Sequence, residues 1–246
     1  MQMSRRVALV LPILATLLLP TLVSSSELLK AAEKGDLAAV NRLIEKGANV
    51  NEAEGDELLT PLMAASFGGH VSVARLLLEK GANVNARDGT LGTALMWAVK
   101  RNYSDVVVLL LGNGADPNLA DKADFTPLMF AATPTVARAL LQSGANPNAV
   151  GGGLAEVTPL IMNAKNPAIL AVLLDAGATV DARDGLNGTV LLEAVLSGSV
   201  ESVKLLLARG ADVSVKNSSG ETALSRANEQ KRADIAALLK AAGATD

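Results

Sequence analysis

One short motif recurs along almost the whole chain and limits how it can fold. The segment Gly-Ala-Asn-Val-Asn at 81–85 returns with small changes at 47–51, 114–118, 144–148, 177–181 and 210–214, and a shortened copy stands at 243–246. From glycine to glycine the steps are 34, 33, 30, 33, 33 and 33 residues. This period predicts a stack of small units, each packed only on its neighbours.

Each unit is predicted to hold two short helices ahead of this motif. The first helix starts at a threonine, as in Thr60-Pro61, because the hydroxyl can accept a hydrogen bond from a free backbone amide of the first turn. Proline suits the first helical position because it has no amide hydrogen that would be left unpaired there. The equivalent threonines are Thr93, Thr126, Thr158, Thr189 and Thr222. The second helix is rich in leucine, as at 76–78, and the Gly-Ala pair is expected to end it with a left-handed cap.

Together these two motifs, in register over six copies, resemble the ankyrin-repeat family. The resemblance implies an all-α repeat solenoid of stacked helix-turn-helix units with β-turn fingers. It covers the domain 26–246, which we divide into units 27–51, 52–85, 86–118, 119–148, 149–181, 182–214 and 215–246.

One departure from the family is systematic. Where the family usually has histidine after Thr-Pro-Leu, this chain has Met63, Met96, Met129, Ile161, Leu192 and Ser225. We therefore expect packing, in place of a threonine–histidine hydrogen bond, to hold that corner of each unit.

Two units are irregular in length. From capping threonine to closing glycine the distance is 18 residues for Thr126 and 19 for Thr158, against 21 elsewhere. This predicts a shortened turn between the helices, near Pro134 and Pro167. The intervening finger is lengthened through 151–156, either as neutral variation of a surface loop or as a change in curvature with a loop that closes on a partner.

The N-terminus has the layout of a secretory signal peptide. A basic start containing Arg5 and Arg6 is followed by an apolar run at 7–23 and small residues, so we predict a signal peptide at 1–25 with cleavage before Ser26 and a periplasmic or secreted protein. The alternative is an uncleaved membrane anchor at 7–23, although Pro12 and Pro20 disfavour a regular helix there.

Composition and charge exclude several classes of function. The net charge is −3, and residues 26–246 carry −5 because the first 25 hold two arginines and no acid, which disfavours nucleic-acid binding. There is no cysteine, so disulfides and thiolate chemistry are excluded. We expect no cofactor and no metal, a monomer, and membrane contact only if residues 7–23 are uncleaved.

Side chains suited to catalysis are sparse. His70 is the only histidine and lies in a Gly-Gly-His turn, where a structural role is expected. Four carboxylates on one finger, those of Glu52, Glu54, Asp56 and Glu57, match no calcium loop and predict a solvated acidic tip. An enzyme using Glu52 or Asp56 as acid or base is the rival interpretation, which we disfavour because fingertip carboxylates are exposed.

The five aromatic residues, by contrast, cluster in one third of the array. By the family's usual placement, Phe67 and Phe125 face solvent, whereas Trp97 and Phe130 are partly covered on the concave side, as interface anchors or as packing between units. We predict a partner-binding patch of these four with four flanking residues, namely Leu59, Lys100, Arg101 and Val157.

The sequence thus favours a non-catalytic protein-interaction module. The resemblance extends to exported, periplasmic ankyrin-repeat proteins of bacteria. It leaves open an immunity or inhibitor protein that neutralises a secreted hydrolase or lipase, and a membrane-anchored scaffold.

Overall fold

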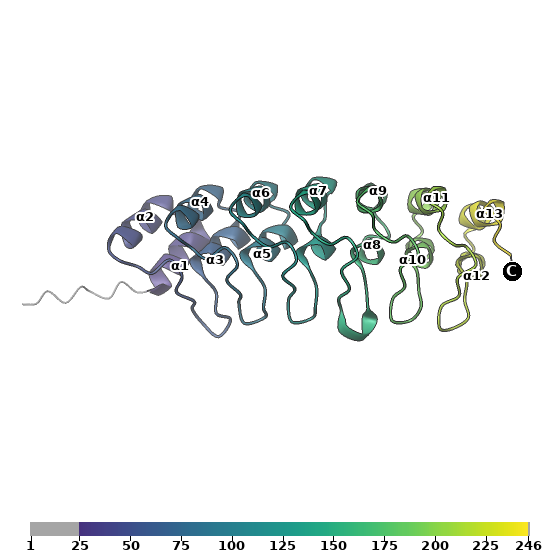
Figure 1. Cartoon of the computed structure of the whole chain (residues 1–246), viewed down its shortest axis with the longest axis horizontal. Coiled ribbons are helices and arrows are strands. Elements are labelled where there is room, and N and C mark those ends of the chain that lie inside the picture. Colours follow the sequence, from purple (N-terminus) through teal and green to yellow (C-terminus); the bar gives the residue numbers. More distant parts are fainter. Residues whose placement is uncertain (1–24, 246) are drawn as a thin grey trace, which may run out of the picture.

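Short helices in two parallel rows make up the computed structural model, which describes residues 25–245 (Figure 1). The inner row consists of α1 (Ser25–Lys34), α3 (Pro61–Gly68), α5 (Ala94–Lys100), η1 (Pro127–Phe130), α8 (Pro159–Met162), α10 (Val190–Ser197) and α12 (Ala223–Glu229). The outer row consists of α2 (Leu37–Glu45), α4 (Val71–Glu79), α6 (Ser104–Gly112), α7 (Pro134–Gln142), α9 (Pro167–Asp175), α11 (Val200–Ala208) and α13 (Ala233–Ala241).

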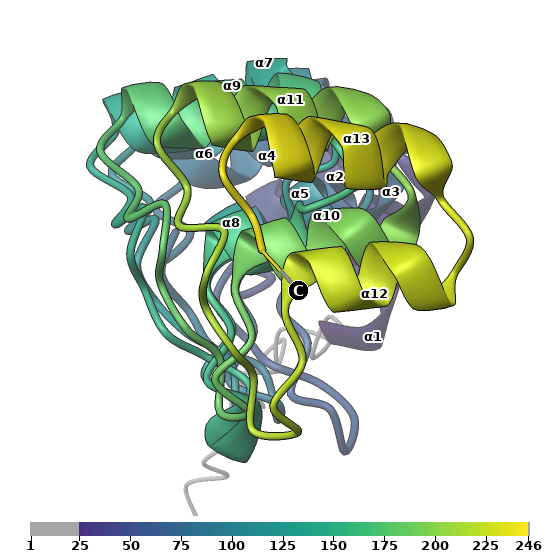
Figure 2. The same ribbon diagram turned by 90° about the vertical axis from the view of Figure 1, so that its right-hand side faces the viewer.

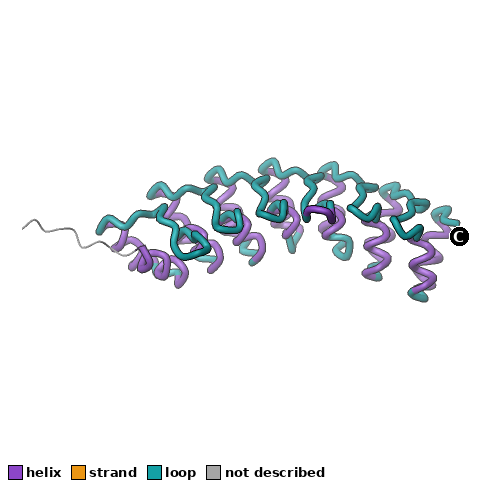
Figure 3. The backbone as a smooth tube through the Cα atoms, turned by 90° about the horizontal axis from the view of Figure 1, so that it is seen from below, coloured by secondary structure: helices purple, strands orange, loops and turns teal. Residues whose placement is uncertain are grey.

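Seen along the stack, the molecule is L-shaped (Figure 2). The two rows of helices lie one above the other, and the fingers leave them at one end and project away. Seen from below, the units follow a shallow arc (Figure 3). The predicted fold class, a helical solenoid with projecting fingers, is confirmed; within residues 25–245 no strand forms, only isolated bridges such as Glu54–Leu59.

Five of the six predicted threonine caps form; the exception is Thr126, whose hydroxyl accepts no hydrogen bond from the helix that follows it. The Thr60 hydroxyl accepts a hydrogen bond of 3.3 Å from the Met63 amide, and Thr93, Thr158, Thr189 and Thr222 cap their helices in the same way. The side chains that replace the family's histidine are buried at Met63, Met96, Met129, Ile161 and Leu192, so packing holds that corner. In the last unit, Ser225 instead completes a capping box by accepting from the Thr222 amide at 2.9 Å.

Glycine of the recurrent motif ends each outer helix, as predicted, in the left-handed conformation. Gly81 has φ +87°, and the following Ala82 donates its amide to Leu77 O at 2.9 Å, which closes the helix with a Schellman motif. A small residue follows the glycine because this position packs against the core; Ala115 and Ala145, for example, are buried.

An asparagine at the end of the motif joins each of the first four units to the next. Asn85 donates its side-chain amide to Gly114 O at 3.1 Å and accepts at its side-chain oxygen from the Asp116 amide at 2.9 Å. Asn51, Asn118 and Asn148 make the same pair of bonds to the following unit. We call this recurrent pair the asparagine bridge.

The fingers are joined by a second set of bonds. Each finger from the third unit onward donates one backbone amide to a carbonyl of the finger before it, as from Gly89 to Glu57 at 2.7 Å and from Lys122 to Thr90 at 2.9 Å. The lengthened finger keeps this pattern, because Gly152 donates to Ala123 and Ala155 O accepts from Gly185. Its extra residues form a short 3-10 turn, η2 (Gly153–Ala155).

The prediction of a shortened turn in the two irregular units is wrong. The residues are missing from the inner helix: η1 and α8 have four residues each, whereas α3 and α10 have eight, and the connecting turns at 131–133 and 163–166 are not shortened. Pro134 and Pro167 start the outer helices, which stack on their neighbours and so cannot shift. The deletion is therefore absorbed by the inner row.

We expect Asn85→Ala to destabilise the chain by about 1–2 kcal/mol, because it removes both bonds of one asparagine bridge. Urea unfolding followed by circular dichroism measures this. Ser214→Ala is the matched control, since Ser214 holds the same motif position but bonds only within its own unit, to Asp212. Equal unfolding midpoints for the two variants would show that the bridge contributes little.

Candidate functional site

The predicted patch lies along the inner helices and fingers of the second to fifth units. Phe67 is on α3, Trp97 and Lys100 are on α5, and Arg101 caps α5. Phe130 belongs to η1. The other three lie on fingers just ahead of an inner helix, namely Leu59, Phe125 and Val157.

Aromatic rings and cations contact one another along this surface. Phe67 contacts Trp97 edge-on, with ring centroids 5.5 Å apart, and Arg101 lies over Phe67 at 4.3 Å. Lys100 lies 5.8 Å from the Trp97 ring and 4.2 Å from the Phe130 ring. Because both distances are within cation–π range, Lys100 links the rings of two units.

Phe125 completes this series by packing edge-on against Phe130, with centroids 5.6 Å apart. We call the series the aromatic–cation row; it consists of Arg101, Phe67, Trp97, Lys100, Phe130 and Phe125. Lys100 also pairs with Asp121 at 3.6 Å.

Exposure differs between the two rings that were predicted to face solvent. Phe67 is 37% exposed, whereas Phe125 is half-buried, because it packs on Phe130 and the lengthened finger covers it. A Cβ at Gly152 would lie 3.3 Å from both the Phe125 ring and the Val157 side chain, so the finger backbone runs directly over this pair. Trp97 and Phe130 are half-buried.

A buried carboxylate fixes the tryptophan ring. Asp88, only 4% exposed, accepts a hydrogen bond of 3.0 Å from Trp97 Nε1. Its other oxygen accepts from the Thr90 amide, the Thr90 hydroxyl and the Gly92 amide. Burial by itself raises the pKa of Asp88, but these hydrogen bonds outweigh it and leave the pKa below the ordinary value of 3.8.

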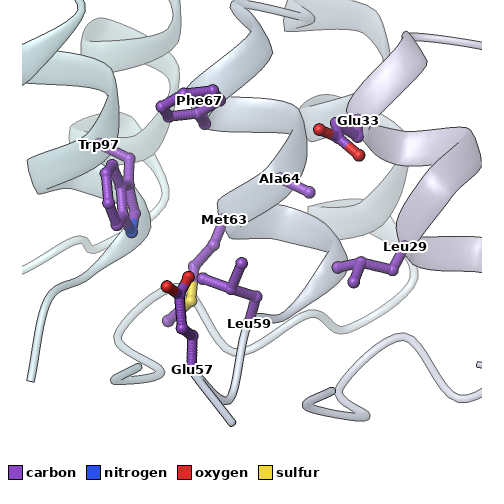
Figure 4. Close-up of a pocket in the computed structure, with 8 residues that line it drawn as sticks. All are labelled: Leu29, Glu33, Glu57, Leu59, Met63, Ala64, Phe67 and Trp97. Atoms are coloured by element: carbon purple, nitrogen blue, oxygen red, sulfur yellow. The ribbon is translucent and has the colours of Figure 1, made fainter. Parts of the chain in front are cut away.

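Next to Trp97 lies an apolar pocket of about 290 Å³ (Figure 4). It is lined by Leu29 and Glu33 of α1, Glu57 and Leu59 of the second finger, Met63, Ala64 and Phe67 of α3, and Trp97 of α5. We call it the Ala64 pocket. Three of the predicted patch residues line it: Leu59, Phe67 and Trp97.

The remaining lining residues were not predicted from the sequence. Ala64 is the fourth residue after the capping threonine, and the other five units have Trp97, Phe130, Met162, Glu193 and Arg226 at that position. When the units are aligned, Ala64 is the only small residue at this position, and this was the feature of the sequence that could have indicated the pocket.

His70 and the acidic finger are placed without catalytic geometry. His70 Nε2 lies 2.8 Å from Glu33 O, and the ring packs on Gly35 and Gly68, which joins the first two units. Of the four acidic-finger residues, only Glu57 lines the Ala64 pocket. Within residues 25–245, no three His, Asp or Glu side chains converge as a metal site would require.

No helix in residues 25–245 is both long and apolar enough to cross a membrane. The predicted signal peptide at 1–25, and the alternative anchor at 7–23, lie outside the described residues apart from Ser25, where α1 begins.

Comparison with known proteins agrees with this architecture. The family model for ankyrin repeats (3 copies) matches residues 28–121, 91–151 and 155–245. A crystal structure of the human ASB11 ankyrin repeat domain is similar, with 28% identity and a TM-score of 0.76, covering 89% of this chain and 98% of that chain.

The ankyrin repeat domain of Bcl-3, described as a unique member of the IkappaB protein family, is also similar. Its identity is 27% and its TM-score 0.75, covering 87% of this chain and 97% of that one. No curated protein sequence matches the chain.

These features define a repeat scaffold, a solenoid of helix pairs with fingers. The chain belongs to the ankyrin-repeat family. Domains of this family generally mediate protein–protein interactions and are typically non-catalytic.

We expect Asp88→Asn to destabilise the chain by about 1–2 kcal/mol at pH 7, because the new amide can turn a donor toward Trp97 or Thr90. The pKa of Asp88 is lowered in the folded chain, so its carboxylate stabilises the fold above pH 3.8 and this contribution disappears as the pH falls below that value.

Unfolding midpoints of the wild type and the variant, measured from pH 7 to pH 3, test this. The difference between them should be constant above pH 5 and shrink below pH 4. A difference that stays constant down to pH 3 would contradict the role assigned to the carboxylate.

Proposed function

We propose that this chain is a non-catalytic binding module of the bacterial periplasm, which holds a protein partner through the aromatic–cation row and the adjoining fingers. The family's general role in protein–protein interaction supports binding as such. The periplasmic location rests on the layout of residues 1–25 alone.

The aromatic–cation row is the observation that supports this face as the binding surface. Four aromatic rings and two cations from three successive units lie in contact on one face, and Phe67 remains substantially exposed. Tryptophan and arginine are enriched among the residues that dominate binding energy at interfaces. The network around Asp88 holds Trp97 in place before binding, which lowers the entropy lost on association.

Leu59 and Val157 extend this surface at its two ends. Leu59 borders the Ala64 pocket, and Val157 lies at the base of the lengthened finger, where Gly152 comes close to both Val157 and Phe125. All eight predicted residues therefore belong to one proposed contact surface, with the polar fingers as its rim.

We expect the double variant Phe67→Ala with Phe125→Ala to weaken partner binding at least about tenfold, because it removes two rings of the row. The measurement is affinity capture from a bacterial envelope fraction, followed by titration of the identified partner. Val108→Ala is the control, since Val108 is exposed on outer helix α6, away from the row. If both variants capture the partner as well as the wild type does, the row is not the binding surface.

The identity of the captured partner separates the proposed roles. A secreted lipase or hydrolase whose activity falls on binding would make the chain an immunity protein, whereas an envelope enzyme whose activity is preserved would make it a supporting factor. N-terminal sequencing of the exported chain decides between signal peptide and anchor: a first residue of Ser26 excludes a membrane-anchored scaffold.

A further inference from the structure

The Ala64 pocket exists because one unit lacks a side chain that the others have. At the fourth position after the capping threonine, the third to seventh units carry tryptophan, phenylalanine, methionine, glutamate and arginine, and only the second carries alanine. Ala64 is itself 8% exposed, so its methyl group forms the floor of the opening that a larger side chain would fill.

The pocket suits a large apolar group. Its volume of about 290 Å³ can be compared with apolar protein cavities of about 150 Å³, which take up benzene. Leu29, Leu59 and Met63 supply an apolar lining. Trp97 lies on one side and contacts Phe67, so an incoming ring would add a further member to the aromatic–cation row.

The charge around the pocket indicates which kind of residue should stand next to the bound apolar group. Glu33 and Glu57 are exposed residues from two different elements, α1 and the second finger. Their carboxylates form no hydrogen bond or ion pair with any residue in 25–245, whereas the lysine of the row is already paired with Asp121. Glu52, Glu54 and Asp56 add negative charge to the same finger, so a cation is favoured there.

We propose that the Ala64 pocket takes a large apolar side chain, preferably aromatic, from a segment of the protein partner that carries a lysine or arginine one or two residues away, paired with Glu33 or Glu57. This inference rests on the proposed function and adds to it the chemistry that is recognised.

A library of random twelve-residue peptides displayed on phage, selected against the purified full chain, tests the proposal. Enriched peptides should share an aromatic or large aliphatic residue next to a basic one. Trp97 is the only tryptophan and lines the pocket, so peptides without tryptophan can be titrated by its fluorescence.

Filling the pocket provides the decisive variant. Ala64→Phe introduces in the second unit the residue type that Phe130 has at the same position of the fourth. It should lower the affinity for the selected peptides at least tenfold. The matched control is Met162→Phe, which introduces the same residue at the same helix position in the fifth unit and should change binding less than twofold. Circular dichroism spectra matching the wild type establish that both variants fold.

The carboxylates are tested separately, on exposed positions where folding is not at risk. Glu33→Gln combined with Glu57→Gln should lower the affinity for the peptides about threefold to tenfold and reduce the dependence of that affinity on salt concentration. Glu201→Gln, an exposed glutamate at the start of α11, controls for net charge.

Several results would overturn the proposal. These are no enrichment, enrichment of acidic peptides, or peptides that bind Ala64→Phe as well as the wild type. Equally tight binding of free N-acetylphenylalaninamide would make the pocket a small-molecule site, and a dimer that Ala64→Phe dissociates would make it a contact between copies. If partner capture is lost in the Phe67 and Phe125 double variant but survives Ala64→Phe, the proposed function stands and this inference fails.

Discussion

The asparagine bridge is the interaction on which the rest of the structure depends. Helix pairs with apolar faces could slide or rotate against one another, since leucine and valine packing is not directional. Four asparagines, such as Asn85, each donate one hydrogen bond to the next unit and accept one from it, which fixes the offset between the first five units. Because the offset is fixed, Phe67, Trp97 and Phe130 from three units come into one continuous row, and the finger carbonyls meet the amides of the next finger.

Because the scaffold is fixed, the same helix position recurs at regular intervals along the stack, and its side chain can differ from unit to unit. The fourth position after the capping threonine is small at Ala64, aromatic at Trp97 and Phe130, and charged at Glu193 and Arg226. Burial raises the pKa of Glu193, and nearby Asp184 raises it further while Arg226 opposes them. The side chain at this position therefore changes from apolar to charged along the stack, which agrees with the proposal that apolar groups bind at the N-terminal half.

The fold could be predicted from the sequence because its determinants are local and repeated. Threonine caps, the glycine that ends each outer helix and the leucine pattern each specify one turn of chain, and six copies make the pattern unambiguous. The contacts between units were harder to predict. Asn85 recurs in four copies of the motif, yet its partner Gly114 lies 29 residues away. Asp88 was not connected with Trp97, because their contact depends on how the finger folds back. The Ala64 pocket was missed since it arises from an absent side chain.

The wrong prediction for the irregular units shows where this scaffold can change. The outer row and the bridges are fixed by stacking, so a deletion is absorbed by the inner helix and an insertion by the finger. In η1 the Met129 amide bonds to Thr126 O, which leaves the Thr126 hydroxyl buried without a partner among the described residues. Such an unsatisfied group costs about 1–3 kcal/mol. The unit with this unpaired hydroxyl is the one that carries Phe125 and Phe130, and the lengthened finger beside it covers Phe125. Both departures from regularity therefore act at the surface proposed to bind, as expected if they were kept for its shape at a cost in stability.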